Sequence, residues 1–167
     1  LDSFSLVDSG YINTFGITPT HPSTQFGYIK PKNKKLSKHS SEVESFLEKP
    51  SQEKANKIFK SKSYFWNSGI FFFSANSFLN EIKSHVPKTY KKVKEVFLEK
   101  KKVFEFISFP EKKFKLLPNQ SIDKSLMEKT KNSSITFTNV DWSDIGSWQG
   151  VWECLKKDKQ NNYSNHK

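Results

Sequence analysis

The sequence contains no arginine, and all 28 of its basic residues are lysine. With 17 acidic residues the formal net charge is +11, which alone would suit binding to nucleic acid or to an anionic membrane surface. Arginine, however, is the side chain that binds phosphate and guanine through two parallel hydrogen bonds, and this sequence has none. The lysines are also spread along the chain, in keeping with an AT-rich coding sequence, so we expect no nucleic-acid partner.

Cysteine and long hydrophobic runs are also scarce. The single Cys154 cannot form an internal disulfide, and no group of Cys and His has the spacing of a zinc site. No run approaches the roughly 18 apolar residues of a membrane span, and the N-terminus has no signal-peptide pattern. We therefore expect a cytoplasmic protein with no membrane partner. The first residue is Leu1 instead of Met, which indicates a piece of a longer protein.

Phenylalanine is abundant, with sixteen copies in 167 residues, and the length suits one domain with a Phe-rich core. The most apolar run, Tyr64 to Phe73, predicts a buried strand. Asn67, Ser68 and Gly69 interrupt it. One interpretation is a β-bulge in which Asn67 bonds its own backbone. The other is that Gly69 opens space and Asn67 presents its amide to a polyhydroxylated or otherwise polar ligand.

Apolar periodicity predicts strands that alternate with helices, the pattern of an α/β domain. The expected strands span 11–17, 26–30, 43–47, 64–73 and 135–140. The expected helices span 1–9, 51–61, 77–86, 88–100, 121–129 and 148–155, with Ser51 and Ser121 as N-caps. Pro31 is expected to end its strand, so that 31–41 forms an exposed loop or hairpin tip. The pattern of 103–114 is mixed and gives no assignment.

Ligands of α/β sheets bind beyond the carboxyl ends of strands, and polar residues follow several of the predicted strands. Glu48 and Lys49 follow one, Asn67 interrupts another, and Asp144 lies between a third and its helix. Together they suit a phosphorylated sugar and a divalent metal, since Glu48 can accept from hydroxyls, Lys49 can pair with phosphate and Asp144 can hold Mg²⁺. Two alternatives remain open: a solvated Glu-Lys-Pro turn, and Asp144 as the N-cap of the last helix.

Six motifs in order resemble the bacterial mannose-1-phosphate guanylyltransferase family. They extend over most of the chain, from about Gly10 to Asp158. The motifs are 15–22, 26–30, 46–50, 64–69, 121–123 with 127–129, and 142–148. The resemblance implies an enzyme that joins GTP and mannose 1-phosphate to give GDP-mannose and pyrophosphate with Mg²⁺. It implies a Rossmann-like nucleotidyltransferase domain, with a mixed sheet flanked by helices, of which 1–158 would be the C-terminal portion and 159–167 a polar tail.

The resemblance also assigns roles to single residues. Lys49 would bind the sugar phosphate and Asp144 would be a metal ligand, and these two would carry the catalysis. Asp123 would support the pocket or cap its helix. The sugar pocket would be lined by Gly27, Glu48, Asn67 and Gly69.

Several family features are missing. The glycine-rich nucleotide loop with its Arg and Lys, a second metal-binding Asp and the isomerase domain of longer members are absent. Gln25 and Phe26 replace a Gly-Tyr pair, and 124–126 replaces Tyr-Ala-Val. We therefore expect a fragment inactive alone, with exposed sheet edges and possible homo-oligomerisation. The alternative is a non-catalytic sugar-phosphate-binding or interaction module that complements a separate N-terminal half.

Overall fold

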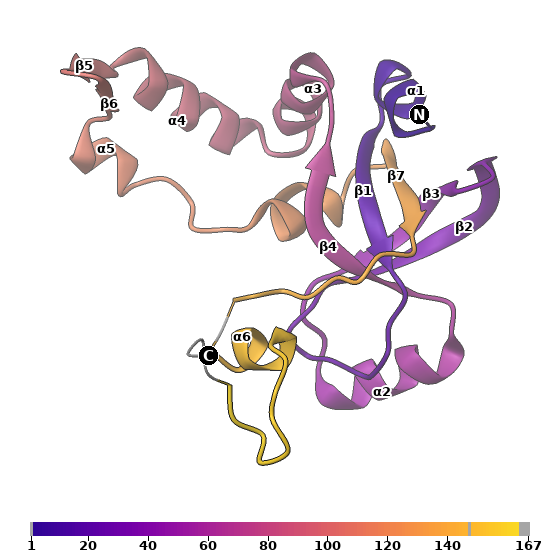
Figure 1. Ribbon diagram of the computed structural model, residues 1–167. Coiled ribbons are helices and arrows are strands. Elements are labelled where there is room, and N and C mark those ends of the chain that lie inside the picture. The colour runs from indigo at the N-terminus through magenta and orange to yellow at the C-terminus, as the bar shows by residue number, and fades with distance from the viewer. Residues whose placement is uncertain (1, 147, 164–167) are drawn as a thin grey trace.

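The computed structural model describes residues 2–146 and 148–163, so predictions for Leu1, Ser147 and 164–167 lie outside the described residues. Its centre is a sheet whose five strands close into a barrel in the order β1-β4-β2-β3-β7 (Figure 1). β1 and β7 pair in parallel, and every other pair is antiparallel. The strands are β1 (Ile12–Ile17), β2 (Tyr28–Ser37), β3 (Ser40–Leu47), β4 (Phe65–Phe72) and β7 (Ser133–Thr138).

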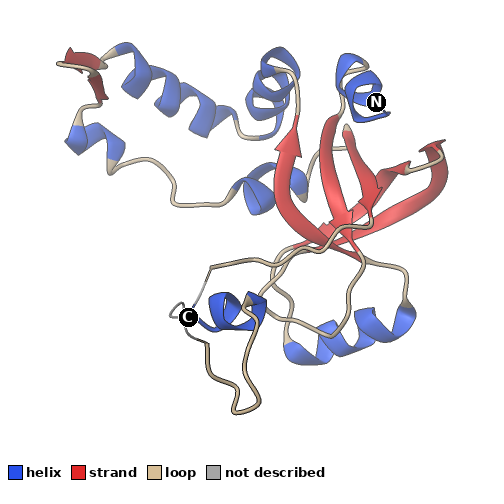
Figure 2. Ribbon diagram, viewed as in Figure 1, coloured by secondary structure: helices blue, strands red, loops and turns tan. Residues whose placement is uncertain are grey.

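Helices surround this sheet, with α1 and α3 at one end of the strands and α2 at the other (Figures 1 and 2). A small hairpin, β5 with β6, lies between α4 and α5 and extends away from the barrel (Figure 1). The mixed α/β architecture predicted from the sequence is confirmed. The helices are α1 (Asp2–Asp8), α2 (Gln52–Ser61), α3 (Ala75–His85), α4 (Pro87–Leu98), α5 (Glu111–Phe114), the π-helical η1 (Asp123–Met127) and α6 (Trp148–Cys154), and the hairpin strands are β5 (Lys101–Val103) and β6 (Phe106–Ser108).

The expectation of exposed sheet edges is right for one strand of the main sheet and wrong for another. β1 pairs with β7 over its whole length, from Ile12 opposite Ser133 to Ile17 opposite Thr138, and this pairing closes the ring. This pairing covers the edge of β1, and a covered edge is less prone to association. On its β4 side, however, β2 pairs only at Tyr28 and Ile29, so within the described residues the part of β2 from Lys30 to Ser37 keeps an open edge there. Across the described parts of the chain, 2–146 and 148–163, no helix has the length and apolar character needed to cross a membrane.

The strand β2 continues past Pro31, so the predicted strand end is wrong, while the alternative of a hairpin tip between Pro31 and Ser41 is confirmed. Pro31 stands opposite Val43 of β3, and the register shifts on both sides of it. Proline cannot donate to the ladder, but a bulge places it where no donor is required. The strand therefore continues to Ser37, and only the two residues before Ser40 form the turn.

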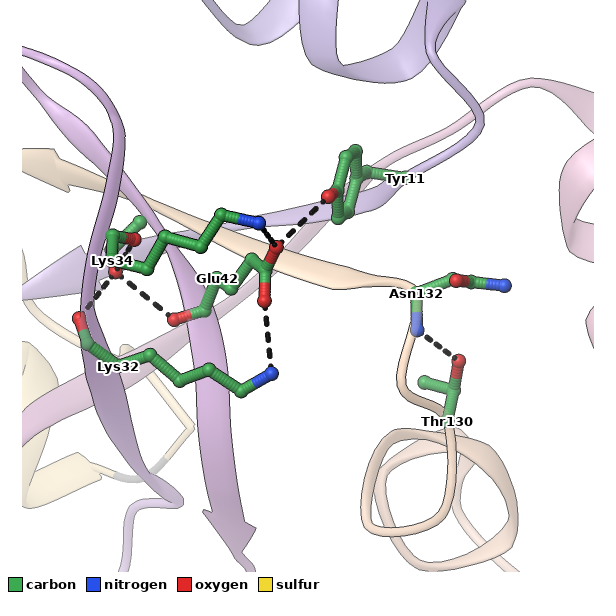
Figure 3. A network of polar contacts seen from close by, with 7 residues as sticks. Tyr11, Lys32, Lys34, Glu42, Thr130 and Asn132 are labelled. Atoms are coloured by element: carbon green, nitrogen blue, oxygen red, sulfur yellow. Dashed lines mark hydrogen bonds and ion pairs between the residues drawn. The ribbon is translucent and has the colours of Figure 1, made fainter.

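A network of polar contacts centred on Glu42 holds this hairpin to β1 (Figure 3). The Glu42 carboxylate accepts from Lys32 Nζ at 2.9 Å and from Lys34 Nζ at 3.0 Å. The Tyr11 hydroxyl donates to the same carboxylate at 3.2 Å. Hydrogen bonds from Lys32 and Lys34 lower the pKa of Glu42 to about 2.

The core is less rich in phenylalanine than expected. Among the described residues the only buried phenylalanine is Phe46, whose cluster is otherwise aliphatic and closed by Leu126 and Met127 of η1. Other phenylalanines pack around this cluster while half-buried, or lie on the surface, such as Phe104 with 89% exposed. There is not enough interior volume for sixteen large rings in a domain of this size.

Two of the predicted N-caps have different outcomes. Ser51 caps α2 as predicted, since its side chain accepts from the backbone N–H of Lys54. Ser121 only approaches the N–H of Lys124, at 3.5 Å, and the segment it precedes forms the π-helical turn η1 in place of an α-helix.

Candidate functional site

A large bulge in β4 forms one wall of the candidate site. Thr14 of β1 faces Phe71, and Gly16 faces Asn67, so two steps along β1 are matched by four along β4. Three residues of β4, Ser68, Gly69 and Ile70, therefore stand against the single Phe15 of β1, two more than regular pairing allows. Gly69 has a φ of +75°, a conformation that glycine adopts without strain, and Ile70 is 55% exposed. The prediction that the whole apolar run is buried is therefore wrong beyond Asn67.

The Asn67 amide is fixed on both sides. Its Oδ1 accepts from the Thr14 hydroxyl at 2.9 Å and from the Gly69 backbone N–H at 3.2 Å. Its Nδ2 donates to Asp123 Oδ1 at 3.2 Å. The bond from the Gly69 N–H confirms the interpretation in which Asn67 bonds its own backbone, and the bond that Asn67 donates to Asp123 agrees with the prediction that Asp123 supports the pocket. Only the second N–H of the amide is left to meet a ligand.

Gly27 provides space for the neighbouring acidic side chain. A Cβ at this position would lie 2.7 Å from Glu48 Oε2 and 3.3 Å from the Asn67 Cβ. The Gly27 carbonyl accepts from the Asn67 N–H at 2.8 Å, which ties the two segments together. Glycine is therefore favoured at this position because the Glu48 carboxylate approaches the backbone too closely to leave room for a Cβ.

Glu48 lies directly after β3, as predicted. Its backbone N–H donates to Glu128 Oε1 at 3.3 Å, so that a second carboxylate is also close. Burial, and then the charge of Asp123, raise the pKa of Glu48 above its ordinary value. A carboxylate in such surroundings gains from any ligand hydroxyl that donates to it.

Lys49 adopts a left-handed backbone conformation with φ of 43°, which is uncommon for a residue with a side chain. No carboxylate within the described residues lies close enough to Lys49 for an ion pair. Strained backbone often marks a binding position, and an unpaired ammonium group can accept an anionic partner.

All six residues assigned from the sequence line one cavity of about 460 Å³: Gly27, Glu48, Lys49, Asn67, Gly69 and Asp144. Asp123 and Trp142 also line it. This cavity adjoins a second one, of about 600 Å³, and Lys49 and Asp144 line both. The walls of the second cavity include the aromatic rings of Phe26, Trp66 and Trp142. The structure therefore brings the predicted residues together, and their roles in binding stay predictions.

Asp144 lies in the exposed loop between β7 and α6. Because α6 begins at Trp148, Asp144 stands outside the N-cap position, and that alternative is wrong. Within residues 2–146 and 148–163, no group of three or more His, Cys, Asp or Glu side chains could hold a metal ion. Magnesium, however, is commonly held by one or two carboxylates together with phosphate oxygens and water, so a single Asp144 fits a shared metal.

Thr14 is the site residue that the sequence analysis missed. It is fully buried, and its hydroxyl can donate either to Asn67 Oδ1 or to the Ile70 carbonyl, at 3.1 Å. In the sequence it is one polar residue in a predicted strand. Only the register of β1 against β4 reveals that it faces the bulge.

Residues 4–161 match the family model described as Nucleotidyl transferase. The chain belongs to the nucleotidyl transferase family. Among its curated relatives is the mannose-1-phosphate guanylyltransferase of Salmonella typhimurium, 38% identical over 154 residues that make up 92% of this chain and 32% of that protein. The enzyme of the same name from Sinorhizobium fredii is 40% identical over 91% of this chain and 29% of its own length. The chain thus spans about a third of the length of these family members.

Solved structures show the same family fold. A crystal structure titled mannose-6-phosphate isomerase, from Helicobacter pylori, superposes with a TM-score of 0.76 at 34% identity, over 84% of this chain and 55% of that one. One titled mannose-1-phosphate geranyltransferase, from Thermus thermophilus, gives a TM-score of 0.74 over 94% of this chain and 44% of that one. At 24% identity the second likeness supports the fold alone.

Proposed function

We propose that this chain is the sugar-phosphate-binding part of a mannose-1-phosphate guanylyltransferase. The observation that carries the proposal is the gathering of all six predicted residues around one cavity, from segments as distant in sequence as Gly27 and Asp144. The names of the relatives support the reaction, in which GTP and mannose 1-phosphate give GDP-mannose and pyrophosphate. A cytoplasmic location, where GTP is available, belongs to the same proposal.

On one side of the cavity a lysine would bind the phosphate, and on the other a carboxylate and an amide would form hydrogen bonds with the sugar hydroxyls. Lys49, which has no ion pair within the described residues, would bind the sugar phosphate. The Glu48 carboxylate would accept from sugar hydroxyls, and the free N–H of Asn67 would donate to one. Each of these groups orients the sugar so that its phosphate oxygen faces the nucleotide.

The reaction needs no nucleophile from the protein, because the sugar phosphate oxygen itself attacks the α-phosphorus of GTP and pyrophosphate leaves. The residues of this chain therefore act by positioning and by charge. Asp144 would hold Mg²⁺, which when bound neutralises charge on the phosphoryl oxygens. The sequence has six glycines and no glycine-rich triphosphate loop, so GTP would bind through a separate nucleotide-binding half.

Calorimetric titration of the chain with mannose 1-phosphate tests the proposal. We expect saturable binding that Lys49→Ala weakens at least about tenfold, since a charge-assisted contact to phosphate is lost. Lys54→Ala, which removes an exposed lysine of α2, is the matched control and should bind as the wild type does. Absence of binding by the wild-type chain, or equal binding by Lys49→Ala, would contradict the proposal.

The second candidate is a non-catalytic binding or interaction module, favoured by the small part of each relative that the chain spans. Both candidates bind the sugar phosphate. They differ once a nucleotide-binding half is supplied as a separate chain, because only a split enzyme would then form GDP-mannose.

A further inference from the structure

The bulge in β4 interrupts the β1–β4 ladder between Thr14 and Gly16, and the Thr14 hydroxyl bonds to residues of the bulged segment. Thr14 is fully buried beside the cavity wall and is not among the residues that line the cavity. Its hydroxyl lies 2.9 Å from Asn67 Oδ1 and 3.1 Å from the Ile70 carbonyl, and since it has one hydrogen it donates to one of them at a time.

The orientation of the Asn67 amide follows from its partners. The Gly69 N–H can only donate, so the atom that it meets is the amide oxygen. The Asp123 carboxylate oxygen accepts, so the atom beside it is the amide nitrogen. In a flipped amide, the nitrogen would face the Gly69 N–H, so that two donors would meet, and the oxygen would face the Asp123 carboxylate, so that two acceptors would meet. Both contacts are unfavourable.

We propose that Thr14 is a positioning residue that, with Asp123 on the opposite side, holds the Asn67 amide so that the cavity receives a single hydrogen-bond donor beside the Glu48 carboxylate. A donor next to an acceptor complements a pair of neighbouring hydroxyls on a hexose, one accepting and the other donating. The inference rests on the proposed function and adds to it a determinant of sugar recognition outside the cavity lining.

Substitution of Thr14 tests this role in the full 167-residue chain. Thr14→Val keeps the shape of the side chain and removes the hydroxyl, so the amide loses one of its restraints. We expect about tenfold weaker binding of mannose 1-phosphate and unchanged binding of inorganic phosphate, which engages only the Lys49 side. Thr14→Ser restores a hydroxyl and should recover the affinity to within about twofold.

The matched control is Thr136→Val. Thr136 of β7 donates to Asn13 Oδ1 at 3.0 Å, so the variant also removes a threonine hydroxyl from an asparagine amide on the same sheet. Asn13 and Thr136 do not line the cavity. We therefore expect Thr136→Val to lower the melting temperature about as much as Thr14→Val does, while its affinity for the sugar phosphate stays unchanged.

The outcomes separate the two hypotheses. If the wild-type chain does not bind mannose 1-phosphate, the proposed function fails and the role of Thr14 fails with it. If the wild type binds and Thr14→Val binds equally well, only the positioning role is overturned. Equal weakening of the sugar phosphate and inorganic phosphate, or weakening by Thr136→Val as well, would also overturn it, because the effect would then be a general loss of structure.

Discussion

At the scale of single residues, Gly27 matters because any side chain there would meet Glu48. In Gly27→Ala the added Cβ would lie 2.7 Å from Glu48 Oε2, and the carboxylate would have to swing away. Since it ends a flexible side chain, we expect a loss of less than about 1 kcal/mol in the free energy of unfolding. Binding of mannose 1-phosphate should weaken about tenfold, because one hydroxyl contact is lost.

Titration calorimetry and thermal unfolding together check this prediction. Gly69→Ala serves as the contrast, since nothing lies within 4 Å of a Cβ there but the φ of +75° disfavours a side chain. That variant should lose about 1 kcal/mol of stability from backbone strain. Wild-type affinity in Gly27→Ala would show that the position of Glu48 is not important for binding.

Glu48 should decrease stability at neutral pH. Its pKa is raised in the folded state, by burial and by the charge of Asp123, above the ordinary value of 4.5. Its favourable contribution is therefore fully present below pH 4.5 and is lost as the pH rises through the raised value. Glu48→Gln should melt at a higher temperature than the wild type at pH 7, and this difference should shrink as the pH falls to 4.

Thermal unfolding of both proteins between pH 4 and pH 8 measures this effect. The same variant should bind mannose 1-phosphate less well at pH 7, since a neutral amide is a weaker acceptor than a carboxylate. A Glu48→Gln protein that melts below the wild type at pH 7 would contradict the account of Glu48 as a destabilised binding group.

The residues of the site could be predicted because their chemistry is visible in the sequence. A carboxylate, a lysine and an amide at strand ends suit a sugar phosphate wherever the strands lie. Thr14 could not be predicted, because its role depends on the register between β1 and β4, and the bulge shifts that register by two residues. The hydrogen bond between Thr14 and the Asn67 amide depends on the same register, so it could not be predicted either.

At the scale of elements, Glu42 of β3 links the β2–β3 hairpin together and to Tyr11, the residue before β1. The folded pKa of Glu42 is about 2, below the ordinary value of 4.5, so its ionised form stabilises the fold above pH 4.5 and this contribution disappears as the pH falls toward 2. Lys32 and Lys34 are largely exposed, and solvent screens their attraction. We therefore expect Glu42→Gln to cost about 1 kcal/mol or less at pH 7.

Chemical denaturation at pH 7 and pH 3 tests this contribution, with Glu53→Gln as the control. Glu53 pairs with Lys57 on the exposed surface of α2, where the side chain of Glu53 is 80% exposed. A stability difference between Glu42→Gln and the wild type that is as large at pH 3 as at pH 7 would be incompatible with an ionised Glu42 as its cause.

Helices and strands that are determined by their own local sequence were predictable, and those that depend on pairing with another strand were not. The α2 helix follows from its apolar spacing and the Ser51 cap, and the structure has it at Gln52–Ser61. The extension of β2 through Pro31 depends on a bulge against β3, which the local sequence does not specify. The short strands β5 and β6 pair only with each other and are fully exposed, so no alternation of buried residues marks them.

At the scale of the whole molecule, the order of strands and helices predicted the α/β class, but not the closed barrel. Closure depends on the pairing of β1 with β7, which are more than a hundred residues apart in the chain. Local periodicity carries no information on such a contact.

The chain alone should make no GDP-mannose from GTP and mannose 1-phosphate with Mg²⁺, because it has the cavity proposed for the sugar phosphate and its sequence has no glycine-rich triphosphate loop. A coupled pyrophosphate-release assay measures this directly. Metal-dependent turnover by the purified 167-residue chain would contradict the proposal that this chain binds the sugar phosphate and a separate half binds GTP.

The most direct test of the central claim is an amide NMR titration of the chain with mannose 1-phosphate, with and without Mg²⁺. We expect dispersed signals, of which those near Gly27, Glu48, Lys49 and Asn67 shift with the sugar phosphate, and that of Asp144 shifts further when Mg²⁺ is added. Signals that stay unchanged at these positions while the protein is folded would contradict the claim that this cavity binds the sugar phosphate.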